Sequence, residues 1–269
     1  MITATVAQRM SLSGRTAVVT GASGALGTVF CTALAELGAG IIAVDRDAQS
    51  LERLRTTLKL APDARLDVTV CDLEDEVQRN ALIEKILCKY PTLDVLVNNA
   101  AFVGTSELQG WASSFAKQSI DTWRRAMEVN LTAAFHLCQA FAPALSAKGR
   151  GSIINIGSIY AESAPDWRLY EGTEMGNPAA YAASKAALLQ LTRWLSTTLA
   201  PDVRANSICP GGIFRNQASN FVKRYEERTP LARMATEQDI VGAFVYLATD
   251  LSSYVTGQTL RVDGGWSVW

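Results

Sequence analysis

Short runs of β-branched and apolar residues alternate along this chain with longer amphipathic segments, and this alternation limits the possible folds more than any other feature. Several runs are apolar at nearly every position, as in strands whose two faces are both buried. The intervals show helical periodicity, for example residues 25–38, which close on Gly38 as a helix C-terminal signal. Strands separated by helices predict a doubly wound α/β domain with a parallel sheet. Seven strands are predicted, at residues 16–20, 39–45, 66–71, 93–98, 152–157, 203–208 and 258–263.

No Pro/Gly/Ser-rich linker, low-complexity tract or internal repeat interrupts the alternation, so we expect one domain over residues 1–269. The chain is 48% hydrophobic and 19% charged, which is typical of a globular protein with one large core. Its net charge of −1, with acidic and basic residues interspersed, creates no field for capturing nucleic acid or an anionic membrane. A small-molecule substrate is therefore the expected partner.

The opening segment MITATVAQRM lacks the apolar core of a secretory signal, and no window approaches the ~18 apolar residues of a membrane span. We therefore expect a cytoplasmic protein. The five cysteines are widely spaced and form no CxxC pair, which favours buried, reduced thiols. His136, the one histidine, lies in a helical pattern and is expected to be structural. No metal site is expected, and a Ser-His-Asp hydrolase would have to use His136 as its base.

The first predicted strand is followed by a glycine-rich turn, TGASGALG, at residues 20–27. Small residues at such a turn let the backbone approach a pyrophosphate, and the next helix offers unpaired N–H groups, although a glycine-rich turn alone is weak evidence. Asp45 ends the second predicted strand, 18 residues after Gly27. A carboxylate there can bind both hydroxyls of a ribose and repel a 2′-phosphate. The pattern predicts a dinucleotide site with NAD favoured over NADP, a preference that Arg46 could weaken.

The segment YAASK places Tyr181 and Lys185 four positions apart, on one face of a predicted helix. Taken alone, such a pair is common on protein surfaces. An ammonium ~5 Å from a phenol, at an effective dielectric of ~20, is worth ~3 kcal/mol and would lower the tyrosine pKa by roughly two units. We therefore expect Lys185 to bring the phenol of Tyr181 towards the working range of a general acid/base.

Taken together and in order, the motifs of this chain resemble the classical short-chain dehydrogenase/reductase family over nearly its whole length. The family's turn motif matches at Thr20, Gly21 and Gly27, with Ala25 where the middle glycine usually stands and Gly24 one place early. The other matching motifs are Asp72 after the third strand, NNAA at 98–101, Asn130 in MEVNLTAAF, Ser158 in INIGSIY, Tyr181 and Lys185 in YAASK, and PGG at 210–212.

The resemblance implies a seven-stranded Rossmann fold and an enzyme that interconverts an alcohol and a ketone by hydride transfer. Tyr181 would exchange a proton with the substrate oxygen, which Ser158 would also bind. Lys185 would hold the nicotinamide ribose, and Asn130 would anchor a water that links Lys185 to bulk solvent. The residues expected to contact the cofactor are Gly21, Ser23, Gly24, Leu26, Gly27, Asp45, Arg46, Asp72, Leu73, Asn99, Lys185, Gly212 and Ile213.

Two departures from the family pattern bear on the substrate. The interval between Ser158 and Tyr181 is longer than usual, so residues 158–180 are expected to form an insert over the active-site mouth. Its Trp167 and Tyr170 suit stacking on a polyhydroxylated ligand, and equally an ordinary subunit contact. Arg215 stands where many members carry a threonine, and it could bind a phosphate or carboxylate or form a rim salt bridge. The resemblance to members from bacterial surface-sugar and sugar-nucleotide biosynthesis favours a sugar or sugar derivative.

Several alternatives stay open at this point. Residues 213–235 occupy the place of the family's mobile substrate lid, but a fixed surface helix would fit as well. A 3-oxoacyl-(acyl-carrier-protein) reductase would share every motif above. A non-catalytic NAD-binding regulator is disfavoured, because it would not need the complete set of proton-transfer residues.

Assembly is expected from the resemblance rather than from the residues. In this family the long helices around 130–147 and 179–199 pack against their copies, and both segments carry apolar stripes here. We therefore expect a homo-oligomer, with a tetramer as the first expectation and a dimer as the alternative. The two tryptophans of the tail GGWSVW are expected to be buried against a neighbouring subunit or the pocket.

Overall fold

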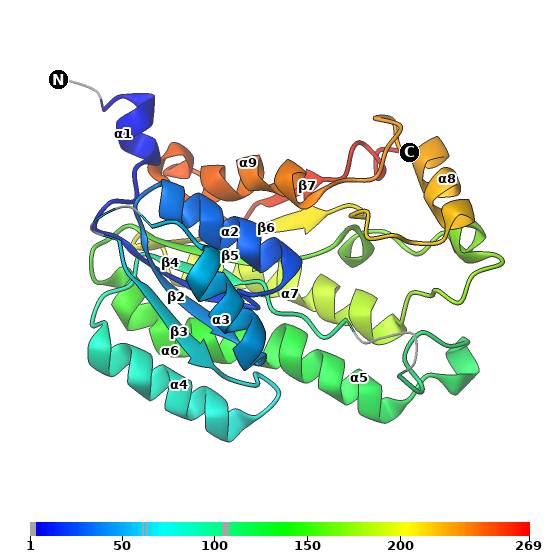
Figure 1. Cartoon of the computed structure of the whole chain (residues 1–269), viewed down its shortest axis with the longest axis horizontal. Coiled ribbons are helices and arrows are strands. Elements are labelled where there is room, and N and C mark those ends of the chain that lie inside the picture. The colour runs from blue at the N-terminus through cyan, green and yellow to red at the C-terminus, as the bar shows by residue number, and fades with distance from the viewer. Residues whose placement is uncertain (1–3, 61, 63, 104–107) are drawn as a thin grey trace.

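Seven parallel strands form one sheet in the order β3-β2-β1-β4-β5-β6-β7 (Figure 1). A computed structural model describes residues 4–60, 62, 64–103 and 108–269. The predicted strands and the doubly wound fold are confirmed, with boundaries that differ by a residue or two. The strands are β1 Thr16–Thr20, β2 Gly40–Asp45, β3 Leu66–Val70, β4 Val95–Asn98, β5 Gly151–Ile156, β6 Val203–Pro210 and β7 Thr259–Val262.

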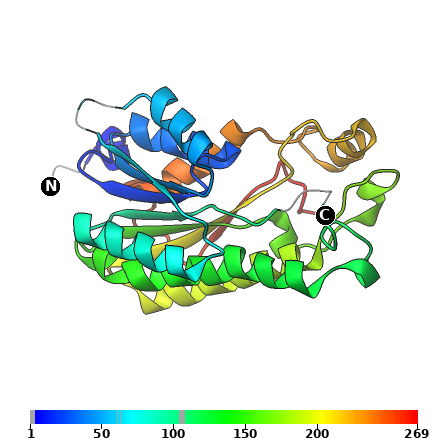
Figure 2. The same cartoon turned by 60° about the horizontal axis from the view of Figure 1, so that its bottom comes forward.

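Helices cover both faces of the sheet (Figure 2). The described helices are α1 Val6–Met10, α2 Ala25–Glu36, α3 Ala48–Thr57, α4 Glu76–Lys89, α5 Ile120–Met127, α6 Ala133–Ser146, α7 Ala179–Thr198, α8 Ser219–Arg228 and α9 Glu237–Ala248. Asp47, Asp75 and Ser119 begin α3, α4 and α5 by accepting hydrogen bonds from N–H groups of the first turn. Among the described residues, none of the helices combines the length and apolar character that a bilayer crossing requires.

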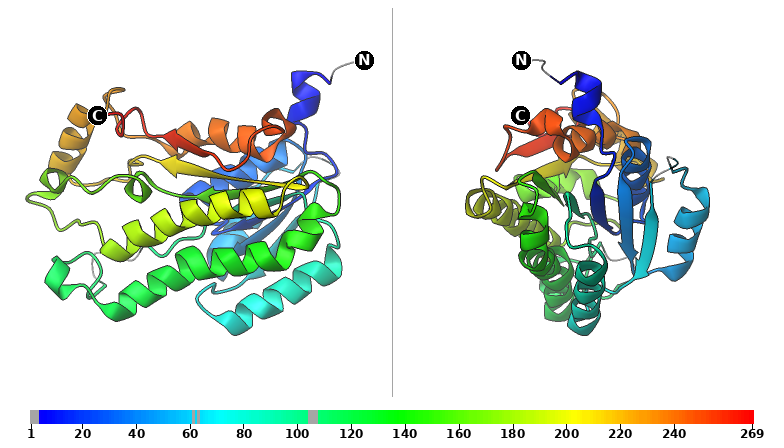
Figure 3. Two further views of the ribbon diagram at one scale, coloured as in Figure 1. Left: turned by 180° about the vertical axis from the view of Figure 1, so that it is seen from behind. Right: turned by 90° about the vertical axis from the view of Figure 1, so that its left-hand side faces the viewer.

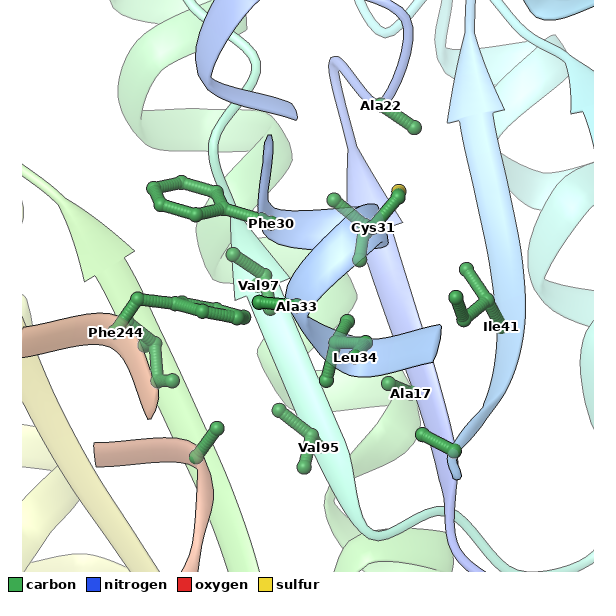
Figure 4. Packing of buried hydrophobic residues seen from close by; sticks show 14 of the residues in the cluster. Ala17, Ala22, Phe30, Cys31, Ala33, Leu34, Ile41, Val95, Val97 and Phe244 are labelled. Carbon is green, nitrogen blue, oxygen red and sulfur yellow. The ribbon is translucent and has the colours of Figure 1, made fainter. Parts of the chain in front are cut away.

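The core consists of two apolar layers, one on each face of the sheet. On the first face α2 and α9 meet over β1 and β4, where the rings of Phe30 and Phe244 stack with their centroids 4.3 Å apart (Figure 4). On the second face α4, α6 and α7 pack on the same strands. Strands buried from both sides explain why their sequences are apolar at almost every position.

The switch point of the sheet lies between β1 and β4, where the direction of strand succession reverses. Beyond the carboxyl ends of the strands, α8 and the C-terminus lie at the same end of the molecule (Figure 1). Helices α5 and α6 are joined by a π-helical turn, Glu128–Thr132, rather than by a loop. Such turns interrupt the regular hydrogen bonding and re-aim side chains, and this one carries Asn130.

Candidate functional site

A cleft of about 730 Å³ opens at the carboxyl ends of the central strands. It is walled by the loops after β1, β2, β3 and β4 on one side and by those after β5 and β6 on the other. Of the residues singled out from the sequence, thirteen line it: Gly21, Gly24, Leu26, Asp45, Arg46, Asp72, Leu73, Asn99, Ser158, Tyr181, Lys185, Ile213 and Arg215.

The glycine-rich turn after β1 is packed too tightly for a side chain at Gly21 or Gly27. Gly21 has a φ of +61°, and a Cβ on it would lie 2.8 Å from the Cα of Ala100. A Cβ on Gly27 would lie 2.0 Å from the carbonyl oxygen of Gly21. Asn99 holds the turn in place by donating from Nδ2 to the carbonyl oxygens of Thr20 (3.0 Å) and Gly21 (2.9 Å). The turn at the start of α2 therefore has the shape of a pyrophosphate cradle, and Gly27 serves its packing rather than the cleft.

Asp45 connects the end of β2 to this turn. Its Oδ2 accepts a hydrogen bond from the backbone N–H of Ser23 at 3.0 Å, and its Oδ1 accepts one from the N–H of Arg46 at 2.8 Å. Asp72 plays a similar part after β3, where Oδ1 accepts from the N–H of Glu74 at 3.0 Å. Both carboxylates line the cleft, whereas Ser23 contributes its backbone to the shape of the turn.

Lys185 and Tyr181 project from the first turns of α7 towards the end of β5. The Nζ of Lys185 donates to the carbonyl oxygen of Ile156 at 2.7 Å and lies 5.9 Å from the ring centroid of Tyr181. Burial lowers the pKa of Lys185 to about 8. Burial also raises the pKa of Tyr181, although a hydrogen bond with Ser158 and the charge of Arg215 act in the opposite direction.

The expectation that the pKa of Tyr181 lies below its ordinary value is therefore wrong for this arrangement, because the net shift is upward. The physical reason is desolvation, which penalises the phenolate more than nearby charges stabilise it. Sequence spacing predicted the proximity of the two groups but not their burial: Lys185 is only 2% exposed, and Tyr181 is partly buried.

Ser158 lies two residues after the end of β5 and is buried. Its Oγ accepts a hydrogen bond from the N–H of Tyr160 at 3.2 Å and so begins the short helical turn Ile159–Ala161. Because the Oγ acts as an acceptor in this bond, the hydroxyl hydrogen of Ser158 can be donated to the Tyr181 phenol or to a ligand oxygen. Behind it lies Cys209, whose thiol has a pKa raised to about 11 by burial and is therefore an unreactive packing group.

Asn130 lies behind the cleft rather than in its lining. Its Oδ1 accepts from the N–H of Phe102 at 2.6 Å, and its Nδ2 donates to Ser184 Oγ at 2.9 Å. Asn130 thus ties the loop after β4 to helix α7, which carries Tyr181 and Lys185. The water-anchoring role that the family resemblance implies stays a prediction.

Two aromatic residues of the insert, Trp167 and Tyr170, do not line the cleft as the sequence suggested, although Ile213 and Arg215 of the predicted lid region do. Trp167 is 58% exposed, and the ring of Tyr170 packs 5.4 Å from that of Phe221 on α8. Neither belongs to the described lining of the cleft. Gly212 lies in a smaller cavity behind it, where its N–H donates to the hydroxyl of Tyr225 at 2.6 Å.

Arg215 does reach the cleft from the loop after β6, as predicted. Its Nε pairs with Oε1 of Glu237, at the start of α9, at 3.1 Å, and its side chain is half exposed. Sequence reasoning did not single out three further lining residues, Phe102, Arg125 and Val129. They come from the loop after β4, from α5 and from the π-helical turn, respectively, and no local pattern signals that placement.

Residues 21–267 match the protein family described as enoyl-(acyl carrier protein) reductase. The chain is 35% identical, over 269 residues, to the galactitol 2-dehydrogenase (L-tagatose-forming) of Cereibacter sphaeroides. That match covers 96% of this chain and 97% of the relative.

Two solved structures extend the likeness. The short-chain dehydrogenase of Leptospira borgpetersenii serovar Hardjo-bovis with bound NAD⁺ is 29% identical, with a TM-score of 0.82 over 99% of this chain and 97% of that one. The gluconate 5-dehydrogenase of Burkholderia cenocepacia, in complex with NADP and tartrate, is 30% identical, with a TM-score of 0.83 over 98% of this chain and 100% of that one.

Proposed function

Because the chain belongs to the short-chain dehydrogenase/reductase family, whose members are oxidoreductases that act on CH–OH groups with a nicotinamide cofactor, we propose that it interconverts a secondary alcohol and a ketone of a sugar or sugar derivative. One observation carries the proposal. The phenol of Tyr181, the hydroxyl of Ser158 and the amine of Lys185 meet in a cleft whose other end is the glycine cradle.

The residues around the cleft fit a dinucleotide. The turn at residues 20–27 would hold its pyrophosphate, Asp45 its adenosine ribose, and Asp72 its adenine. When bound, the nicotinamide supplies or accepts the hydride. We propose NAD as the preferred form, because the Asp45 carboxylate would repel a 2′-phosphate.

Tyr181 acts as the acid or base. Since burial raises its pKa, the phenol is protonated at neutral pH and is ready to donate to a substrate carbonyl oxygen. Ser158 donates a second hydrogen bond to the same oxygen and stabilises the charge that develops there. The ammonium of Lys185, fixed on Ile156, stabilises the phenolate left after proton transfer.

The proposed substrate is a polyol or a sugar acid. Relatives named for galactitol and gluconate support a polyhydroxylated substrate. Arg215 adds a half-exposed guanidinium at the cleft, and it favours a substrate with a carboxylate, which would share Arg215 with Glu237. We expect Arg215→Gln to raise the KM for aldonates while leaving the KM for neutral polyols nearly unchanged.

We also propose that the protein works in the cytoplasm as a homo-oligomer, with the tetramer as the first expectation. The insert at 158–180 and the region at 213–235 would form the cover of the substrate site within a single domain.

The proposal is tested with a panel of polyols, aldonates and acyl thioesters, each followed by absorbance of the reduced cofactor at both pH 6 and pH 9. We expect turnover of a polyol or an aldonate by the wild type, and its loss in Tyr181→Phe with NADH affinity kept. Turnover of acyl thioesters alone would point to the acyl-carrier-protein alternative. Undiminished turnover by Tyr181→Phe would refute the assigned acid/base.

A further inference from the structure

Arg125, on the last turn of α5, crosses the cleft wall to the loop that follows β3. Its Nε and Nη2 donate to Oε1 and Oε2 of Glu74 at 2.7 and 3.0 Å, which makes the pair bidentate. Arg125 belongs to the described lining of the cleft, whereas Glu74 does not. The guanidinium is therefore oriented by Glu74 and presented to a ligand.

The same guanidinium is held from a second side. Its Cζ lies 4.9 Å from the ring centroid of Phe102, which is buried and whose N–H is bonded to Asn130. A planar guanidinium over an aromatic face, with its edge occupied by a carboxylate, has little rotational freedom. Arg125 thus joins the loop after β3, with Glu74, to the loop after β4, with Phe102.

These two loops carry Asp72, Leu73 and Asn99, which wall the part of the cleft where the adenosine of a dinucleotide would lie. We propose that Arg125 is a binding residue for the adenosine half of the cofactor and that Glu74 is its positioning residue. The inference rests on the proposed function. It adds to that function a cofactor contact that none of the family motifs in this chain includes.

The pairing of Arg125 with Glu74 indicates which atoms of the cofactor Arg125 contacts. Glu74 offsets the positive charge, so the site is suited to the neutral acceptor atoms of adenine and ribose more than to the pyrophosphate. The two bonds to Glu74 use Nε and Nη2, and the Nη1 amino group remains to donate to such an acceptor.

The neighbouring arginine provides a matched control. Arg124 has a side chain that is 75% exposed and pairs with Asp121 at 3.7 Å on the same helix. It carries the same charge one residue away but does not belong to the described lining of the cleft. If cofactor binding depended only on positive charge at α5, removing either arginine would weaken it. If it depends on a specific contact, only the removal of Arg125 will weaken it.

The experiment is isothermal titration of the full chain with ADP-ribose, NADH and nicotinamide mononucleotide. We expect Arg125→Ala to raise the dissociation constants of ADP-ribose and NADH by about tenfold and to leave that of nicotinamide mononucleotide unchanged. Glu74→Gln should weaken the same two ligands by about threefold, because it keeps the packing but loses the charged bidentate bonds. Arg125→Lys should fall between Arg125→Ala and the wild type, and Arg124→Ala should match the wild type.

The thermal midpoint of each variant identifies any loss of folding, which would lower the affinity for all three ligands together. Unchanged ADP-ribose affinity in Arg125→Ala, or an equal loss in Arg124→Ala, would overturn the binding role. Wild-type affinity in Glu74→Gln would overturn the positioning role. A wild type that binds neither ADP-ribose nor NADH would instead refute the proposed function, so the two failures are distinguishable.

Discussion

At the scale of single residues, burial rather than charge pairing governs the chemistry of Tyr181 and Lys185. Desolvation raises the pKa of the phenol and lowers that of the amine, so the neutral forms of both groups are favoured relative to water. The bond from Lys185 to the Ile156 carbonyl keeps the amine near the phenol without an anionic partner. The phenol of Tyr181 can therefore donate a proton at neutral pH, and it becomes able to accept one only as the pH rises.

This state predicts different pH profiles for the two directions of reaction. Reduction needs a protonated phenol and an ammonium at Lys185, so kcat/KM should be flat near neutrality and fall by about tenfold per unit above pH 8. Oxidation needs the phenolate, so kcat/KM should rise by about tenfold per unit up to pH 8 and then level off, as deprotonation of Lys185 cancels the further gain. Initial rates between pH 5.5 and 10 measure both profiles. An oxidation rate that is flat from pH 6 to pH 8 would contradict a raised Tyr181 pKa.

Asp45 is expected to decide between the two cofactor forms. A carboxylate and a phosphate ~5 Å apart at an effective dielectric of ~20 repel each other by ~3 kcal/mol. Asp45→Asn keeps an acceptor for the N–H of Ser23 but removes this repulsion. The preference for NADH over NADPH should then shrink by roughly a hundredfold, measured as the ratio of dissociation constants. Arg46→Ala should weaken the remaining NADPH binding, and an unchanged ratio in Asp45→Asn would remove Asp45 from the selectivity.

At the scale of elements, the insert, α8 and the C-terminal tail are joined by direct side-chain contacts. Asp166 of the insert binds Arg228 of α8 at 2.7 Å, and Arg224 donates to the carbonyl oxygen of Glu171 at 2.6 Å. The guanidinium of Arg228 also lies 4.5 Å from the ring centroid of Trp266, which is buried in the tail. Trp266 of the tail therefore packs within its own chain, against α8.

These contacts predict that the insert and α8 open together. Asp166→Asn should loosen both, whereas Arg168→Ala should not, because Arg168 is the 78% exposed partner of Asp166 and has no side-chain bond to α8 among the described residues. Hydrogen exchange followed by mass spectrometry should show faster exchange in 158–180 and in 219–228 for Asp166→Asn only. Faster exchange in one segment alone would show that the two move separately.

The elements also show what the sequence could and could not predict. The central strands β1, β2 and β4 follow most clearly from their apolar runs, because a strand buried on both faces leaves a local signature, whereas the edge strands β3 and β7 are only partly buried. The π-helical turn at 128–132 does not, since its sequence continues the helical pattern of α5 and α6. Trp167 and Tyr170 suggested a stacking surface, but their direction depends on contacts with α8, which is distant in sequence. Arg125 was missed for the same reason.

At the scale of the whole molecule, the helices on one face of the sheet expose aromatic side chains to solvent. Helix α7 lies beside α5 and its continuation α6 on one side (Figure 3). Each of these three helices exposes an aromatic side chain, Trp123, Phe135 and Trp194, of which Trp194 is 55% exposed. Exposed aromatic groups on adjacent helices favour burial against another surface, which agrees with the expectation of a homo-oligomer through these helices.

The homo-oligomer is tested by light scattering coupled to size-exclusion chromatography at micromolar concentration. The wild type should have a mass above that of one chain, because burial of these rings between copies removes apolar surface from water. Trp194→Glu and Phe135→Glu should each shift the mass towards a smaller species, since a carboxylate in such an interface loses its hydration without gaining a partner. Val77→Glu is the control, because Val77 is 76% exposed on α4. A monomeric wild type, or equal dissociation by Val77→Glu, would contradict assembly through α6 and α7. Tight NADH binding by a dissociated variant would show that each cleft is complete within one chain.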